Sequence, residues 1–185
     1  MTDVWQLPVE AVIGGKTYHL HTDYRDILEI IGYLEDPALP EFLRWQIGAG
    51  LFFEEPMEQI YLQEALEYMA RFIRCGEGDK PGPKLLDWQQ DAPLIIADIN
   101  RVSGQEIRGA RYMHWWTFLS WFHGIGQGQL SAVVAIREKL RKGKKLEDWE
   151  RQFYRENKAK IDLQKRYTRQ ELEERERLER MLEKA

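Results

Sequence analysis

Three glycines near the middle of the chain are spaced like those of a phosphate-binding loop. Gly124, Gly126 and Gly128 lie within five residues, and glycine-rich loops can surround a phosphate with backbone N–H groups. Such a loop follows a β-strand and opens a helix, whereas here the preceding segment has helical character. We therefore interpret these glycines as a helix end and a turn, and the sequence predicts no cofactor.

Histidines could bind a metal ion only if the fold brought distant elements together. No two of them are spaced i and i+4, and none has the adjacent glutamate of zinc proteases. The sequence therefore predicts no metal site, and it indicates core or rim positions for the four histidines, which are His19, His21, His114 and His123.

Three aspartates and one cysteine are the remaining candidates for catalysis. Asp87, Asp91 and Asp98 would lie near one face of a helix, where the electrostatics of a helix start accounts for the first two. Cys75 is the only cysteine, so there is no internal disulfide and no multi-cysteine metal site. No base lies near Cys75 in sequence, and no serine-hydrolase, Walker or kinase motif is present. The sequence predicts that this protein is not an enzyme.

A dense group of aromatic residues follows. It could be a base-stacking platform, but the 25 residues from Tyr112 to Ile136 contain no Lys, Arg, Asp or Glu, whereas single-strand binders combine aromatic and basic residues. The glycines also leave its apolar run too short to cross a membrane. We therefore predict that these aromatic residues form the structural core: Trp115, Trp116, Phe118, Trp121 and Phe122.

Charge is distributed unevenly along the 185 residues. The net charge is −4, which argues against a dedicated nucleic-acid binder. Residues 1–136 contain 10 basic and 19 acidic side chains, whereas residues 137–185 contain 17 basic and 12 acidic ones. The last part is too highly charged to form a core of its own. We therefore predict a helical body over residues 1–142 and a charged helical tail over residues 143–185.

The apolar spacing predicts a mainly α protein: a compact helical domain with a small N-terminal β-hairpin and a long charged C-terminal extension. Gly14-Gly15 between two short apolar segments is typical of a tight hairpin, and Asp23 is placed to cap a helix. Residues 40–53 predict a short helix broken near Gly48 and Gly50, and residues 56–74 predict a long amphipathic helix. A Thr168–Glu171 capping box would begin a second tail helix.

The few large apolar residues of the tail are too sparse for a coiled coil. They are either part of a freestanding charged helix or the contacts by which the tail binds a helical partner. The second interpretation gives these partner-binding candidates: Trp149, Phe153, Tyr154, Ile161, Tyr167 and Leu172.

Three stretches together resemble the bacteriophage gene product fifteen family, whose members are encoded among the tail genes of phages and prophages. They are Thr22-Asp23-Tyr24-Arg25, then Phe72-Ile73-Arg74-Cys75-Gly76, and then Asp87 to Ile95 followed by Met113-His114-Trp115-Trp116-Thr117-Phe118 and later by Ile136-Arg137.

The resemblance implies a tail assembly chaperone. Such a protein would bind the tape measure protein, and the tail tube protein as a second possible partner, in the host cytoplasm. It would bind through Trp149, Phe153, Tyr154 and the basic residues around them, or through a groove on the body. It would keep the tape measure protein from aggregating until the tube polymerises, would self-associate, and would be absent from the virion. Two alternatives stay open: a minor tail or joining component built into the virion, and a nucleic-acid binder that uses the basic tail.

Overall fold

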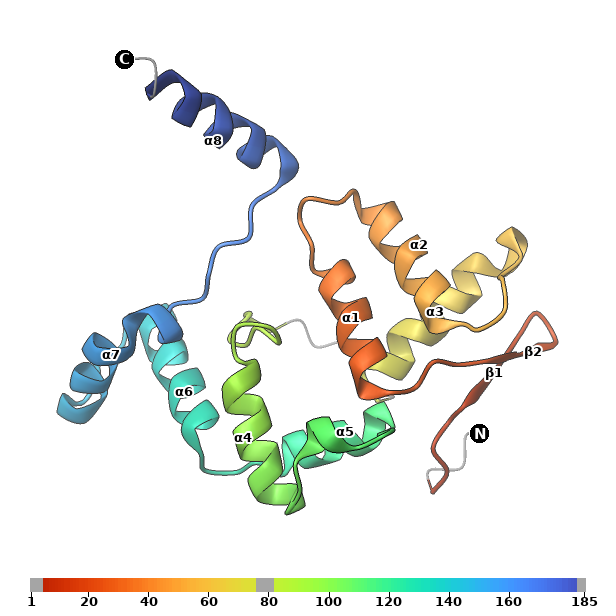
Figure 1. Cartoon of the computed structure of the whole chain (residues 1–185), viewed down its shortest axis with the longest axis horizontal. Coiled ribbons are helices and arrows are strands. Elements are labelled where there is room, and N and C mark those ends of the chain that lie inside the picture. Colours follow the sequence, from red (N-terminus) through yellow and green to blue (C-terminus); the bar gives the residue numbers. More distant parts are fainter. Residues whose placement is uncertain (1–4, 76–81, 183–185) are drawn as a thin grey trace. The chain divides into compact units, whose positions relative to one another are not determined.

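A computed structural model describes residues 5–75 and 82–182. The chain is mainly helical and forms two compact units (Figure 1). The first unit comprises residues 1–76 and 165–185, and the second comprises residues 77–164. The expected fold class, a helical protein with a small N-terminal hairpin, is confirmed. Within the described segments, no helix is long and apolar enough to cross a membrane.

The first unit begins with the predicted hairpin. Strands β1 (Glu10–Ile13) and β2 (Lys16–His19) pair antiparallel, with Ile13 opposite Lys16. Gly14 and Gly15 form the turn with φ of +56° and +80°, a backbone conformation that favours glycine. The inward side chain of Tyr18 is completely buried, so the hairpin covers one side of this unit's core.

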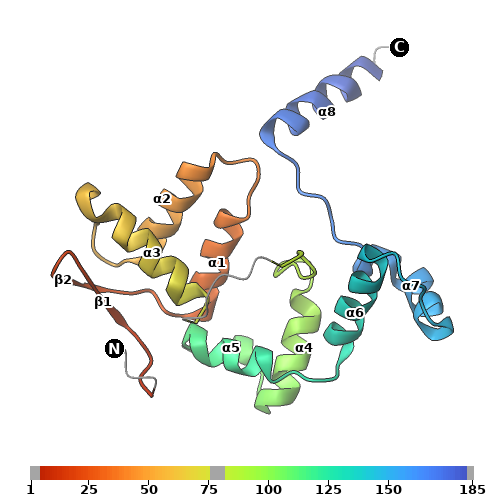
Figure 2. The ribbon, with the colours of Figure 1, turned by 180° about the vertical axis from the view of Figure 1, so that it is seen from behind.

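Three helices complete that core. Helices α1 (Tyr24–Leu34) and α3 (Leu62–Ile73) both pack against α2 (Glu41–Phe52), as Figures 1 and 2 show from opposite sides. The Asp23 carboxylate accepts a hydrogen bond from the Arg25 N–H, as predicted for an N-cap. A short 3₁₀ turn, η1 (Gln59–Tyr61), precedes α3, so the amphipathic helix predicted over 56–74 begins later than expected.

Helix α2 continues through both glycines, where the sequence predicted a break. A Cβ atom at Gly48 would lie 3.3 Å from Met69 Cε and 3.4 Å from Ile30 Cγ2, so the glycine lets α2 approach both neighbouring helices closely. Glycine lowers helix stability by only about 1 kcal/mol. The packing of α2 against two helices outweighs this local preference.

The second unit is entirely helical among its described residues. Its helices, in chain order, are α4 (Ala92–Ser103), η2 (Ile107–Gly109), α5 (Trp115–His123), α6 (Gln129–Arg141) and α7 (Asp148–Ile161). Helix α4 packs against α5 and α6, and α7 packs against α6. Leu146, which precedes α7, and Ile161, the last residue of α7, are buried in a cluster with Val133 and Ile136 of α6. The boundary predicted at residues 142–143 therefore falls inside this unit.

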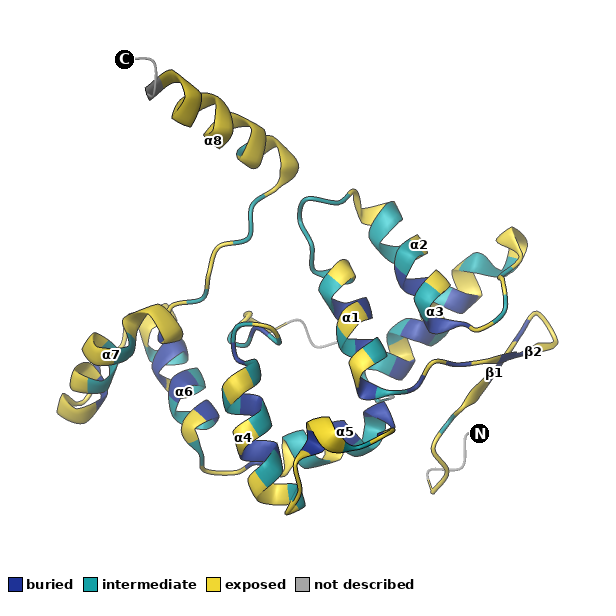
Figure 3. Cartoon of the chain, in the orientation of Figure 1, coloured by how far each residue is buried: buried dark blue, intermediate teal, exposed yellow. Residues whose placement is uncertain are grey.

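Helix α8 (Arg169–Leu182) is the last element. The predicted capping box begins it: the Thr168 N–H donates to the Glu171 carboxylate, and the Glu171 N–H donates to Thr168 Oγ1. Almost every residue of α8 is exposed (Figure 3). Helix α8 is therefore solvated, whereas α7 packs against α6.

Candidate docking surface

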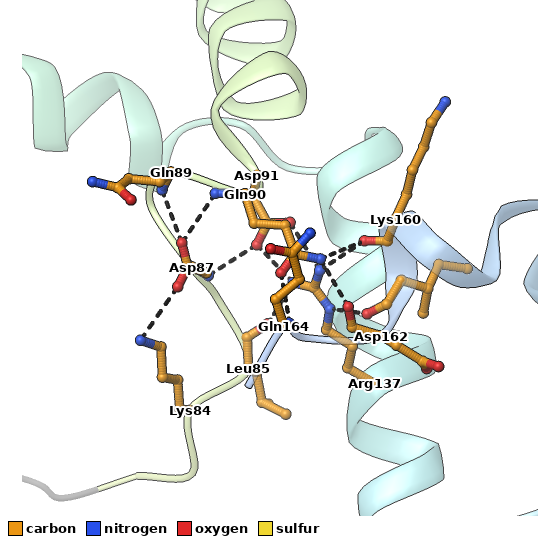
Figure 4. Close-up of polar contacts among 11 residues, drawn as sticks. Lys84, Leu85, Asp87, Gln89, Gln90, Asp91, Arg137, Lys160, Asp162 and Gln164 are labelled. Carbon is orange, nitrogen blue, oxygen red and sulfur yellow. Dashed lines mark hydrogen bonds and ion pairs between the residues drawn. The ribbon is translucent and has the colours of Figure 1, made fainter. Parts of the chain in front are cut away.

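Arg137, on α6, places its guanidinium inside the second unit with 5% of the residue exposed. All five of its N–H groups donate hydrogen bonds (Figure 4). Two reach the Asp91 carboxylate, at 2.6 and 2.8 Å, and three reach the backbone carbonyls of Leu85, Lys160 and Ile161. The last two carbonyls belong to the final turn of α7. The carbonyls of a helix's final turn have no N–H partner within the helix. Arg137 therefore fixes the end of α7.

The Asp91 carboxylate is the partner of that guanidinium and is also buried, with 1% of the residue exposed. Asp91 stands at the N-cap position of α4, but its side chain makes no cap hydrogen bond. Its Oδ2 instead accepts from Arg137 and from the Asp87 N–H. Asp87 in turn accepts from the N–H groups of Gln89 and Gln90. Asp87 therefore orders the turn before α4, and Asp91 pairs with a cation, which the sequence did not predict.

Gln90 holds the segment that leaves α7. Its Nε2 donates to the carbonyls of Lys160, at 3.1 Å, and Asp162, at 2.8 Å. Its Oε1 accepts from the Gln164 N–H at 2.9 Å (Figure 4). We call Gln90, Asp91 and Arg137 the α7 clamp. Every N–H donor of the Arg137 guanidinium is already bonded, and the charges of Arg137 and Asp91 are buried and paired with each other. The clamp therefore has a positioning role.

The other end of α7 is held by a second ion pair. Lys139 Nζ on α6 lies 2.6 and 2.8 Å from the two carboxylate oxygens of Glu150, a residue only 3% exposed. Glu150 also accepts from the Glu147 N–H, which closes the capping box of α7. The bond to Lys139 lowers the pKa of Glu150, and the same bond raises the pKa of Lys139. Both ends of α7 are therefore fixed to α6.

The outward face of α7 carries Trp149, which is 55% exposed. Its indole Nε1 donates to Glu147 Oε2 at 3.0 Å, so one edge of the ring is held while the rest faces solvent. Phe153 and Tyr154 are partly buried against the α6–α7 cluster, and the Tyr154 hydroxyl donates to Asp162. That bond to Asp162 raises the pKa of Tyr154.

The predicted partner-binding residues do not form one surface. Ile161 is completely buried, so it supports the fold of the second unit and offers no contact surface. Tyr167 precedes α8, where the Lys165 ammonium and the Arg175 guanidinium lie 4.9 and 5.7 Å from its ring centroid. Leu172 lies on α8 and is 40% exposed. Of the candidates that are not fully buried, only Trp149, Phe153 and Tyr154 lie on the positioned helix α7.

The aromatic residues predicted as core divide into two groups. Trp115 and Phe118 are 1% exposed and stack with their ring centroids 5.5 Å apart. Trp116, Trp121 and Phe122 have intermediate exposure. The ring of Phe122 contacts Trp88 at 5.0 Å between centroids, so a tryptophan before α4 contributes to this cluster.

The remaining chemical candidates have structural roles. Gly124 ends α5 and Gly128 opens α6. The Asp98 carboxylate accepts from the Leu130 N–H at that start, so the electropositive end of α6 already has an anionic partner. His114 Nδ1 accepts from the Trp116 N–H and caps α5. Nowhere in residues 5–75 and 82–182 do three His, Cys, Asp or Glu side chains gather as a metal site would require.

The sequence interpretation missed the clamp, although one signal for Arg137 was present. Arg137 is the first charged residue after the uncharged stretch 112–136, and it follows Leu130, Val133 and Ile136 on the apolar stripe of α6. A charged residue that continues a buried stripe needs a buried partner. Its partner, 46 residues away, could not be identified from local spacing.

Residues 4–163 match the family model described as bacteriophage Gp15 protein. The matched range runs from the hairpin through the end of α7, and α8 lies outside it. The comparison with curated proteins found no match, and neither did the comparison with solved structures.

Proposed function

Because this chain belongs to the bacteriophage Gp15 protein family, we propose that it is a tail assembly chaperone that binds the tape measure protein. The observation that carries the proposal is α7, a helix fixed at both ends that presents a tryptophan to solvent. Exposed aromatic residues on rigid elements are frequent anchors of protein interfaces.

The geometry suits a helical partner. Trp149 and Phe153 are four residues apart and therefore lie on adjacent turns of α7, and an amphipathic partner helix could place an apolar side chain between them. Arg151 and Arg155 on the same helix are also exposed. In this proposal the partner presents apolar residues with acidic neighbours.

Such a chaperone acts before the tail is complete. Covering the apolar surface of a long helical protein would prevent aggregation until the tail tube protein assembles around it. The proposal therefore places the chain in the host cytoplasm during infection and outside the finished virion.

Co-expression with the tape measure protein tests the proposal. We expect the full chain to keep that protein in the soluble fraction and to co-elute with it. Trp149→Ala should weaken binding by about 2 kcal/mol or more if the residue is an interface anchor. Trp5→Ala is the matched control, because Trp5 is an exposed tryptophan of the other unit, at 91% exposure, and it should leave co-elution unchanged.

Two results would reject the proposal. If the chain and the tape measure protein never associate, and mass spectrometry finds the chain in purified virions, it is a structural tail component. If the chain instead binds nucleic acid with a steep salt dependence, it uses its basic residues on phosphates.

A further inference from the structure

The first unit has an open groove of about 650 Å³ between α2 and the start of α3. Its apolar lining comes from Ala49, Phe53, Met57 and Leu62. Phe53 is buried at 4% exposure and forms part of the floor. A Cβ atom at Gly50, also in the lining, would meet nothing within 4 Å, so α2 leaves open space on this side.

Two consecutive glutamates give this groove its charge. Glu54 and Glu55 belong to its lining, which contains no Lys or Arg. Glu58 lies in the same loop and is exposed. Glu55 pairs with His19 at 2.6 Å, whereas Glu54 and Glu58 make no ion pair with any residue that the structure describes. We call this feature the acidic groove.

The net negative charge of residues 1–76 adds to the negative charge of the groove. Residues 1–76 contain 13 acidic and 5 basic side chains. The potential around the groove is therefore negative beyond the two lining glutamates, and it would attract a basic surface before contact.

A complementary surface occurs on the second unit. Residues 140–145, which end α6 and follow it, contain four basic side chains and no acidic one. Leu140 is 38% exposed there, and Arg141, Lys144 and Lys145 are exposed. Among residues 5–75 and 82–182 these three cations have no ion-pair partner. We call residues 140–145 the basic end of α6.

We propose that the basic end of α6 in one copy of the chain docks in the acidic groove of a second copy. Leu140 would enter the apolar floor, and Lys144 and Lys145 would meet Glu54 and Glu58 at its rim. Complementary charges accelerate encounter and fix the register of such a contact. The proposal concerns this chain alone and does not depend on the tape measure protein.

The two contact surfaces are different patches of the same chain. A head-to-tail contact of this kind repeats from copy to copy and gives a ring where the rotation closes, or a filament where it does not. Because the rim contacts are exposed ion pairs, the assembly should dissociate as salt rises.

Sedimentation velocity on the purified full chain tests the contact through two variants. The groove variant carries Glu54→Lys with Glu58→Lys, and the basic-end variant carries Lys144→Glu with Lys145→Glu. We expect the wild type to associate at low salt, and each variant alone to be monomeric. An equimolar mixture should associate again, because the intact groove of one variant meets the intact basic end of the other and the two reversed surfaces are also complementary in charge.

Two further variants separate charge from folding. Glu29→Lys with Glu67→Lys reverses two exposed charges outside the groove lining and should associate like the wild type. Gly50→Trp fills the open space of the groove without altering charge and should abolish association while the circular dichroism spectrum stays helical.

Three outcomes would overturn the proposal. A wild-type chain that is monomeric at every concentration and salt has no such contact between copies, and the groove then has another occupant, within the same chain or on another protein. Variants that associate as the wild type does would place the contact elsewhere. Two monomeric variants that fail to associate when mixed would exclude a head-to-tail contact between these two surfaces.

Discussion

Helices α7 and α8 are both 14 residues long and both highly charged, yet among the residues that the structure describes only α7 contributes buried side chains. Leu146, just before α7, and Ile161, its last residue, are buried against α6. The last carbonyls of α7 accept from Arg137. Helix α8 is exposed on nearly all sides (Figure 3). Charge content therefore does not decide whether a helix packs. A few correctly placed apolar residues and one buried cation decide it.

The two helices also differ in the kind of ion pair that supports them. Arg137 and Asp91 form a pair whose side chains are 5% and 1% exposed. On α8, the i, i+4 pairs Arg169–Glu173 and Arg175–Glu179 lie in solvent. Exposed helix pairs contribute only about 0.3 to 0.5 kcal/mol each, and isolated helices of this length are marginal in water.

The largest expected effect comes from breaking the clamp. Arg137→Met leaves the Asp91 carboxylate buried without its cation and removes the donors to three carbonyls. We expect a loss of about 3–5 kcal/mol in the free energy of unfolding, measured by urea denaturation. Arg175→Met on α8 is the matched control and should change stability by less than about 0.5 kcal/mol. Equal effects of the two variants would contradict the difference between the helices.

Truncation of a buried apolar side chain of α7 should have the second-largest effect on stability. Ile161→Ala creates a cavity in the α6–α7 cluster and should lower the free energy of unfolding by about 2–5 kcal/mol. Leu172→Ala on α8, where the side chain is 40% exposed, should change it by less than about 0.5 kcal/mol. Thermal unfolding of the two variants measures the difference, and a midpoint for Ile161→Ala close to wild type would show that Ile161 is not buried.

Removal of the Gln90 amide should have an intermediate effect. Gln90→Ala deletes three hydrogen bonds to residues 160–164, each contributing about 0.5–1.5 kcal/mol. Because Gln90 is only partly buried, water can replace some of them. We expect a total loss of about 1 kcal/mol and faster amide exchange at Gln164. Unchanged exchange at Gln164 would mean that Gln90 does not hold this segment.

The smallest effect concerns the start of α8. Hydrogen bonds from Lys165 and Thr168 lower the pKa of Glu171 to about 2, whereas an unfolded glutamate titrates near about 4.3. A depressed folded pKa stabilises the folded state above the unfolded value and loses that effect as pH falls. The helicity of α8 should therefore decline between about pH 4 and pH 2. Side-chain carboxyl NMR would follow it, and a Glu171 pKa near the unfolded value would refute the capping box.

Local signals in the sequence predicted much of this fold. Gly14-Gly15 specifies the hairpin, Asp23 caps α1, and Thr168 with Glu171 begins α8. Each of these depends on residues within a few positions of one another. Backbone conformation at turns and helix capping can therefore be predicted without knowledge of the tertiary structure.

The features that the sequence did not reveal depend on distant partners. Helix α2 stays continuous through Gly48 because Ile30 and Met69 pack against it. Asp91 meets a cation 46 residues away, and Ile161 is buried by residues of α6. Of the predicted docking residues, Ile161 is therefore covered by the fold, and Trp149 on the same helix stays exposed. Periodicity identifies apolar residues, but it does not say which of them the fold will cover.

Hydrogen exchange of the free full chain, read by mass spectrometry, tests most directly whether the clamp makes α7 part of a folded unit. Amides buried in cooperative units open only with a large fraction of the unfolding free energy, whereas solvated helices open locally. We expect the α7 amides to be protected as strongly as those of α6, and the α8 amides to exchange far faster. Protection of α7 as weak as that of α8 would contradict this expectation.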